Sequence, residues 1–105
     1  MRGGITVANQ PSIHGIILGY CIRHYREALQ KDNPKWTQHF VGGESAGLDP
    51  EHYSKIERGK YPHTSFITVA NIARTLDCSL DTLFEHYEKE LANYYKNRLD
   101  DNDGD

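Results

Sequence analysis

The fold is best indicated by one segment, Gly47-Leu48-Asp49-Pro50-Glu51-His52-Tyr53-Ser54-Lys55-Ile56-Glu57-Arg58-Gly59-Lys60. This segment contains a short helix with its start and stop signals in place. Asp49 can accept hydrogen bonds from the free N–H groups of the first turn, and Pro50 suits the first helical position, where its missing N–H costs nothing. Gly59 readily adopts the left-handed conformation in which many helices end. We therefore expect a helix over residues 50–58.

The entry of the chain into this helix is also specified. Leu48 and Tyr53 occupy the two positions of a hydrophobic staple, in which the residue before the cap packs against the fourth helical residue. Such a contact fixes the angle between the helix and the chain that precedes it. A short helix held at a defined angle to the one before it is what docking into the major groove of DNA requires.

Apolar residues recur at helical spacing in the rest of the sequence, each run preceded by a capping residue, so we expect four more helices and no strands. They run from a Ser12 cap to about Gln30, from a Thr37 cap to about Ser45, from a Thr64 or Ser65 cap after Pro62 to the region of Leu76, and from a Ser79 cap to about Leu99. The expected fold class is all-α with five helices, the last of them extended.

Short motifs follow one another in a fixed order between Leu18 and Phe84. They are Leu18-Gly19, Ile22-Arg23, Arg26, Thr37-Gln38, Ala46-Gly47-Leu48, Tyr53, Ile56-Glu57-Arg58-Gly59, Pro62, Ile72-Ala73, Leu76, Ser79-Leu80 and Leu83-Phe84. In this order the chain resembles the lambda-repressor-like helix-turn-helix family, also called the Cro/repressor or xenobiotic-response-element family. Residues 48–59 are most similar to the controller proteins of restriction–modification systems. The resemblance implies a five-helix domain that binds double-stranded DNA.

One departure from the family pattern lies before the second helix. Arg26 and Thr37 stand further apart than the corresponding residues of family members. We interpret the segment Lys31-Asp32-Asn33-Pro34-Lys35 as a loop insertion, which a surface connection tolerates at little cost in stability.

A second departure lies inside the second helix. One extra residue separates Thr37-Gln38 from Ala46-Gly47, so either Gly42 or Gly43 can take the small-residue position where the second and third helices cross. An interior glycine weakens a helix by about 1 kcal/mol relative to alanine. We therefore expect the second helix to be bulged or dynamic.

The chain divides into a flexible N-terminus (residues 1–11), a helix-turn-helix domain (12–84), a C-terminal helix extension (85–99) and an acidic tail expected to be disordered (100–105). The net charge of −3 is unusual for a DNA-binding protein, but four aspartates lie in the tail, and without them the rest of the chain carries +1. We interpret the tail as solubilising, although it could also compete with DNA phosphates for the basic surface.

Composition favours one small cytoplasmic domain, and the family resemblance implies association with the nucleoid of a bacterium or with phage DNA. At 105 residues the chain can hold a single modest core, and it has neither a long apolar run nor a signal peptide, so we expect no membrane association.

Cys21 and His24 have ligand-like spacing, but no second pair of ligands follows. Cys21 and Cys78 are expected to be buried reduced thiols. No catalytic or cofactor motif is present, so we expect no enzyme activity, no metal and no cofactor.

The first turns of the helix over residues 50–58 face base edges in the docking geometry of this family. The expected base-reading residues are Glu51, His52, Ser54 and Lys55. Lys55 can donate to O6 and N7 of guanine, and Glu51 can accept from the amino group of cytosine. The alternatives are a Glu51 that only complements the helix dipole, a His52 that contacts phosphate, or residues that are simply solvated.

Phosphate contacts are expected on two flanks of this helix. By the family resemblance Gln38 contacts a phosphate at the start of the second helix, and the loop after the third helix adds Arg58, Lys60 and His63. The alternative for each is a solvated surface side chain.

The same resemblance implies an inward-facing ion pair between Arg26 and Glu57, for which the planar guanidinium is well suited. We assign this pair a structural role; the alternative is two independent surface charges.

An apolar stripe continues at helical spacing beyond Phe84, through Tyr87, Leu91, Tyr94 and Tyr95. The stripe can pack against a second copy of the chain, fold back over the first helix, or bind another protein. We expect a homodimer, because twofold dimers of this family bind palindromic operators.

These observations together predict a sequence-specific DNA-binding transcriptional regulator, which acts as a dimeric repressor or controller on a palindromic operator in the major groove. The alternatives are an antitoxin that neutralises a toxin through its C-terminal helix and represses its own operon, or a protein-bridging module of the same fold.

Overall fold

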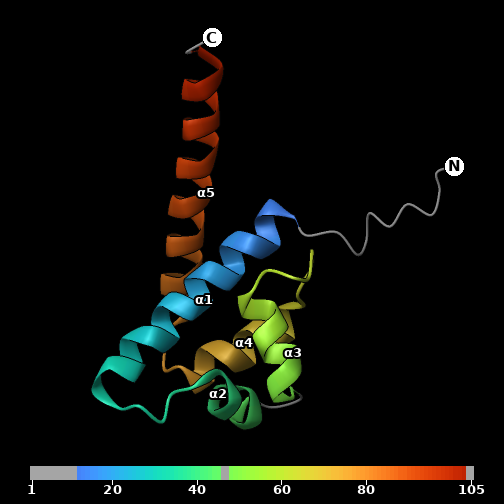
Figure 1. Cartoon of the computed structure of the whole chain (residues 1–105), viewed down its shortest axis with the longest axis vertical. Helices are drawn as coiled ribbons and strands as arrows, with labels where there is room; N and C mark the ends of the chain where they lie inside the picture. The colour runs from blue at the N-terminus through green and yellow to red at the C-terminus, as the bar shows by residue number, and fades with distance from the viewer. Residues whose placement is uncertain (1–11, 46–47, 104–105) are drawn as a thin grey trace, which may run out of the picture.

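The computed structural model of the chain describes residues 12–45 and 48–103, which form five helices and no strand (Figure 1). The helices are α1 (Ile13–Asp32), α2 (Gln38–Glu44), α3 (Pro50–Glu57), α4 (Phe66–Thr75) and α5 (Leu80–Asp103). The expected all-α class with an extended last helix is confirmed. The N-terminal segment 1–11, expected to be flexible, lies outside the described residues.

Each helix begins where a side-chain oxygen satisfies one of the free N–H groups of its first turn. The hydrogen bonds run to Ser12 from Gly15, to Thr37 from Phe40, to Asp49 from His52, to Ser65 from Thr68 and to Ser79 from Thr82. Of the two alternatives at the start of α4, Ser65 is the cap. Local signals in the sequence therefore set all five helix starts.

The end of α3 has the left-handed residue that the sequence predicts. Gly59 has a φ of +71°, and its N–H donates to the carbonyl of Ile56 at 3.0 Å. The next N–H, of Lys60, donates to the carbonyl of Lys55 at 3.0 Å. These two bonds form a Schellman motif, which uses carbonyl groups that the helix end would otherwise leave free. Arg58 is the cap just outside the helix, where we expected the last helical residue.

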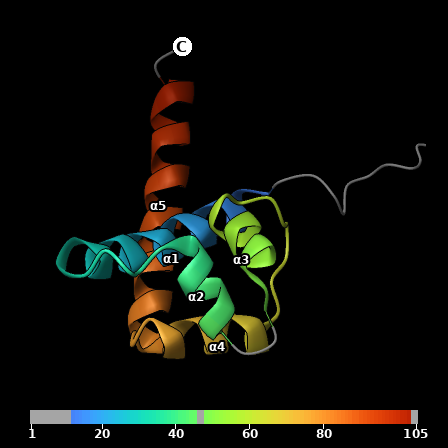
Figure 2. The same ribbon diagram turned by 60° about the horizontal axis from the view of Figure 1, so that its bottom comes forward.

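Helix α1 lies across the molecule between α3 and α5, and α4 packs against α2 and α5 (Figure 2). The core between them consists of Ile17, Cys21, Ile22, Val41, Tyr53, Ile56, Ile72, Leu76 and Leu83. The backbones of α1 and α3 approach closely at Gly19, where an added Cβ would lie 2.3 Å from the carbonyl oxygen of Ile56. Both cysteines are free thiols, but Cys78 is only half-buried, whereas Cys21 is buried as expected.

The crossing of α2 and α3 identifies which glycine occupies the small-residue position. A Cβ added to Gly42 would lie 2.5 Å from Cα of Pro50, whereas one added to Gly43 would meet nothing within 4 Å. The position is therefore Gly42, and the extra residue lies after it. The expectation of a bulged second helix is wrong, since α2 is a regular helix from Gln38 to Glu44.

Two helices are longer than expected. Helix α1 continues past Gln30 to Asp32, so the inserted segment begins inside it. Helix α5 continues past Leu99 to Asp103, so part of the acidic tail expected to be disordered is helical. The reason is that no glycine or proline stands between these positions to end either helix.

The apolar stripe on α5 divides into an inward and an outward part. Tyr87, Leu91 and Tyr94 pack against the core of the same chain, as in the alternative in which the stripe folds back over the first helix. Tyr95 remains 47% exposed. Beyond these contacts α5 projects away from the other four helices (Figure 1).

Candidate nucleic-acid interface

Helix α3 has one buried and one exposed face. Tyr53, Ile56 and Glu57 are buried, because they face α1 and α2. The four residues expected to read bases lie on the remaining surface: Glu51 and His52 are exposed, and Ser54 and Lys55 are partly exposed. The structure therefore brings the four candidates together on one helix, which its buried face holds in place.

These four side chains have partners on the protein surface. Lys55 Nζ lies 3.5 Å from Glu51 Oε2, one turn away along α3. The ring of His52 meets the ring of Tyr61 edge-on, with 4.9 Å between their centroids. The ion pair is solvent-exposed, and such pairs contribute little to stability. Lys55 and Glu51 can therefore exchange this contact for another partner at small cost.

A buried ion pair anchors the inner face of α3. Arg26 Nε donates to Glu57 Oε2 at 2.6 Å, and a second guanidinium nitrogen donates to Oε1 at 3.1 Å. The Arg26 and Glu57 side chains are only 7% and 0% exposed. A bidentate pair fixes direction as well as distance, so it sets the orientation of α3 relative to α1.

Further hydrogen bonds complete this polar cluster. The Glu57 carboxylate also accepts from the Tyr53 hydroxyl and from the amide nitrogen of Gln38, the latter at 2.9 Å. Arg26 also donates to the carbonyl of Trp36 at 3.1 Å. Among the described residues, no buried side-chain nitrogen or oxygen lacks a hydrogen-bond partner. The burial of two charges is therefore compensated by contacts to both of them.

The Glu57 carboxylate raises the pKa values of the Arg26 and Tyr53 side chains that donate to it. Burial alone would lower the pKa of the Arg26 guanidinium, but the hydrogen bonds and charge of Glu57 raise it above its usual value. Burial, together with the negative charge of Glu57, raises the pKa of the Tyr53 phenol. Tyr53 is therefore a neutral donor to the carboxylate at physiological pH.

The residues expected to contact phosphate differ in their surroundings. Gln38 is partly buried and its side chain is directed at Glu57. Arg58 is exposed and its Nε donates to the carbonyl of Ser54 at 3.4 Å, and Lys60 is exposed directly after the end of α3. His63 instead lines a cleft formed with α1, α4 and α5.

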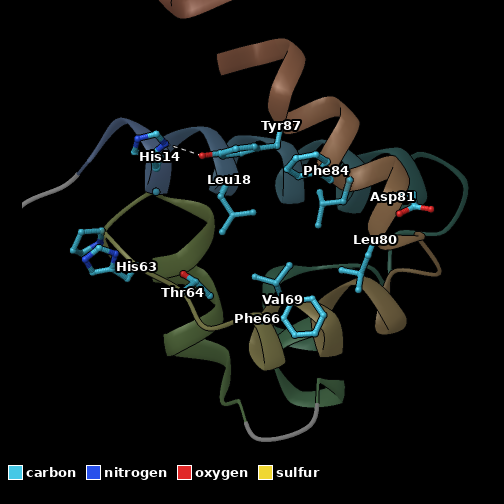
Figure 3. Close-up of a pocket in the computed structure, with 13 residues that line it drawn as sticks. His14, Leu18, His63, Thr64, Phe66, Val69, Leu80, Asp81, Phe84 and Tyr87 are labelled. Carbon is cyan, nitrogen blue, oxygen red and sulfur yellow. Dashed lines mark hydrogen bonds between the residues drawn. The ribbon is translucent and has the colours of Figure 1, made fainter. Parts of the chain in front are cut away.

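This cleft is apolar and has a volume of about 500 Å³ (Figure 3). Figure 3 shows His14 and His63 at one end and Asp81 at the other, with Leu18, Val69 and Phe84 between them. The Tyr87 hydroxyl on its wall is 2.7 Å from Nδ1 of His14. Phe66 and Phe84, which line it, are 68% and 60% exposed, and the neighbouring Ile67 is 66% exposed.

The hydrogen bonds of Tyr53 and Gln38 to Glu57 were not predicted from the sequence. For Tyr53 a signal existed, since residues four apart lie on the same face of a helix and Tyr53 precedes Glu57 by one turn. For Gln38 no local signal exists, because the contact joins residues 19 apart in the chain. The cleft was also missed, because its walls come from four separate segments.

Residues 43–83 match a family model described as Helix-turn-helix. The matched segment contains α3, α4 and the start of α5. No curated protein and no solved structure matches the chain significantly.

The described residues contain no helix that is apolar and long enough to cross a membrane. In the same residues, no three potential metal ligands come together.

The match over residues 43–83, together with the five-helix fold, shows that this segment is similar to the helix-turn-helix domains of the lambda-repressor-like family, which bind DNA.

Proposed function

We propose that this chain is a sequence-specific transcriptional regulator that inserts α3 into the major groove of DNA. The observation that carries the proposal is the division of α3 into a polar exposed face and a buried face fixed by Glu57. A helix that reads bases must present hydrogen-bonding side chains outward while its own orientation is fixed. Helix α3 meets both requirements.

In this proposal Lys55 and Glu51 read base edges, with His52 and Ser54 beside them. Lys55 donates to guanine and Glu51 accepts from cytosine, which favours a half-site containing G·C pairs. Arg58 and Lys60 contact phosphates next to the end of α3. Gln38 has an additional structural role, because its amide holds Glu57.

The charge distribution supports DNA binding on the α2–α3 side. Helix α5 carries seven acidic and three basic residues, so it repels phosphate. Figure 1 shows that α5 projects away from α2 and α3. DNA bound at α3 therefore avoids the net negative charge of α5.

We also propose that the regulator acts as a homodimer on a palindromic operator, but with a different interface from the one expected. Most of the α5 stripe is used within the chain. The exposed apolar side chains around the cleft, Phe66, Ile67 and Phe84, form a patch of the kind that marks an interface. In this proposal the patch pairs with its copy about a twofold axis, as a palindromic operator with two half-sites requires.

Selection of bound sites from random duplex DNA tests the proposal. Wild-type protein should enrich one motif with twofold symmetry. Lys55→Ala should weaken binding to that motif by roughly 1–3 kcal/mol and relax the preference at one base pair per half-site. Lys60→Ala is the matched control, since loss of a phosphate contact should weaken all sequences about equally. The absence of any enriched motif with wild-type protein would contradict sequence-specific binding.

A second candidate is an antitoxin that binds a toxin through α5 and represses its own operon. The observation that favours it is the projecting end of α5 with the exposed Tyr95, which the fold itself does not use. Co-purification of this chain with the product of a neighbouring toxin gene, lost on truncation after Tyr94, would support this candidate.

A further inference from the structure

The inserted connection between α1 and α2 has a defined conformation. The N–H of Asn33 donates to the carbonyl of Leu29 at 3.1 Å and ends α1. The Asn33 side chain accepts from the N–H of Lys35 at 3.1 Å, and its carbonyl accepts from the N–H of Trp36 at 3.2 Å. The N–H of Thr37 then donates to the carbonyl of Lys35 at 2.7 Å, directly before α2. This insertion therefore holds its residues at fixed positions.

The side chain of Lys35 is held by two aromatic rings. Its ammonium nitrogen lies 5.6 Å from the ring centroid of Trp36 and 5.2 Å from that of Phe40. The two rings meet edge-on with their centroids 5.2 Å apart. Both distances from Nζ are typical of cation–π contacts, which attract the charge without neutralising it. Lys35 is thus exposed and partly ordered.

The position of Lys35 relative to the recognition helix is also fixed. The next residue, Trp36, accepts a hydrogen bond from Arg26 through its carbonyl at 3.1 Å. Arg26 holds Glu57 at the end of α3, and Glu57 in turn accepts from Gln38 at the start of α2. Lys35 therefore adjoins the polar cluster that joins α1, α2 and α3.

Several other cations of this region are already paired with carboxylates. Arg23 pairs with Glu27 at 2.9 Å, Arg26 with Glu57, and Lys55 with Glu51. Within residues 12–45 and 48–98, whose side chains the structure describes, Lys35 has no carboxylate within ion-pair distance. A compact ammonium group with a free charge is suited to a point contact with phosphate.

We propose that Lys35 contacts the DNA backbone beside the start of α2, so that the insertion extends the phosphate footprint beyond the segment after α3. This inference rests on the proposed function. It adds a non-specific contact, which strengthens binding to every sequence and makes it more dependent on salt. Specificity remains with α3.

The test is a salt titration of duplex binding with Lys35→Gln, using the motif selected by wild-type protein and a random duplex of the same length. Loss of one phosphate contact should reduce the slope of log affinity against log salt by about 0.9. The fall in affinity between 50 and 200 mM salt should therefore become smaller by about 3.5-fold, equally for both duplexes. Lys35→Arg should keep the wild-type slope.

Lys96→Gln on the projecting part of α5 is the matched control, since it removes the same charge far from α2 and should leave the slope unchanged. Melting curves of each variant establish that the fold is intact. A wild-type slope for Lys35→Gln would overturn this inference while leaving the proposed function in place. Failure of the wild-type protein to bind any duplex would instead overturn the proposed function.

Discussion

The two sides of α1 are attached to the rest of the molecule by different kinds of contact. On the α3 side, Arg26 and Glu57 form a buried bidentate pair, and the backbones meet so closely at Gly19 that a Cβ would not fit. On the α5 side, aromatic rings that are partly exposed to solvent make contacts with α1. They include His14 with Tyr87, Tyr20 with His86 and His24 with His86.

This difference indicates which orientation the fold must keep constant. Hydrogen bonds and charges depend steeply on direction, so the α1–α3 contact tolerates little rotation of the recognition helix. Ring contacts are adaptable, and they hold α5 without fixing it to the same degree. The side on which we propose DNA binding is therefore held by contacts that a single substitution breaks more easily.

The largest effect is expected from removing one partner of the buried pair. Glu57→Ala leaves the Arg26 charge and two donors, Tyr53 and Gln38, without their acceptor, and should cost about 3–5 kcal/mol of folding stability. Arg26→Ala should cost a similar amount. Urea unfolding followed by circular dichroism measures both.

The double variant sharpens this prediction. Because each single variant leaves its partner charge buried, the loss in Arg26→Ala/Glu57→Ala should be clearly smaller than the two single losses added together. Additive losses would show that the two side chains act independently, and the contrast between the two sides of α1 would then fail.

An intermediate effect is expected at the α2–α3 crossing. Gly42→Ala places a Cβ against the backbone of Pro50 and should destabilise the fold by about 2–3 kcal/mol. Gly43→Ala is the matched control: its Cβ meets nothing, so it should stabilise α2 by about 0.5–1 kcal/mol. Thermal melting of the two variants decides, and equal shifts of the same sign would contradict the assignment of Gly42 to the crossing.

The smallest effect on stability is expected at exposed apolar residues of the α5 side. Phe84→Asp should change folding stability by no more than about 0.5–1 kcal/mol, because the side chain is 60% exposed, yet it should convert the dimer to monomer. Tyr95→Asp is the comparison on the original stripe and should leave the dimer intact. Sedimentation velocity measures both. If only Tyr95→Asp dissociates the dimer, the dimer interface lies on the apolar stripe of α5 and not at Phe84.

The sequence alone predicted the helices well, because helix starts depend on residues only three or four positions apart. The caps at Ser12, Thr37, Asp49 and Ser79 are side chains that bond to their own first turn, and the end at Gly59 is equally local. The expected ends of α1 and α5 were less accurate, since a helix without a glycine or proline stop continues for as long as nothing opposes it.

The candidate site was predictable only in part. The exposed face of α3 follows from helical periodicity, and the Arg26–Glu57 pair was reached through the family resemblance. The attachment of Gln38 to Glu57 could not be predicted, because it depends on how two helices are placed in space.

Local sequence patterns thus specify where the helices begin and which side of α3 is polar, because both depend on neighbours along one helix. The packing of the helices, by contrast, places Gly42 rather than Gly43 at the crossing, and it turns Tyr87 and Tyr94 toward the core and Tyr95 toward solvent. Those outcomes depend on the close approach of segments distant in the chain. A shift of one residue changes the neighbours of each side chain without changing the local pattern.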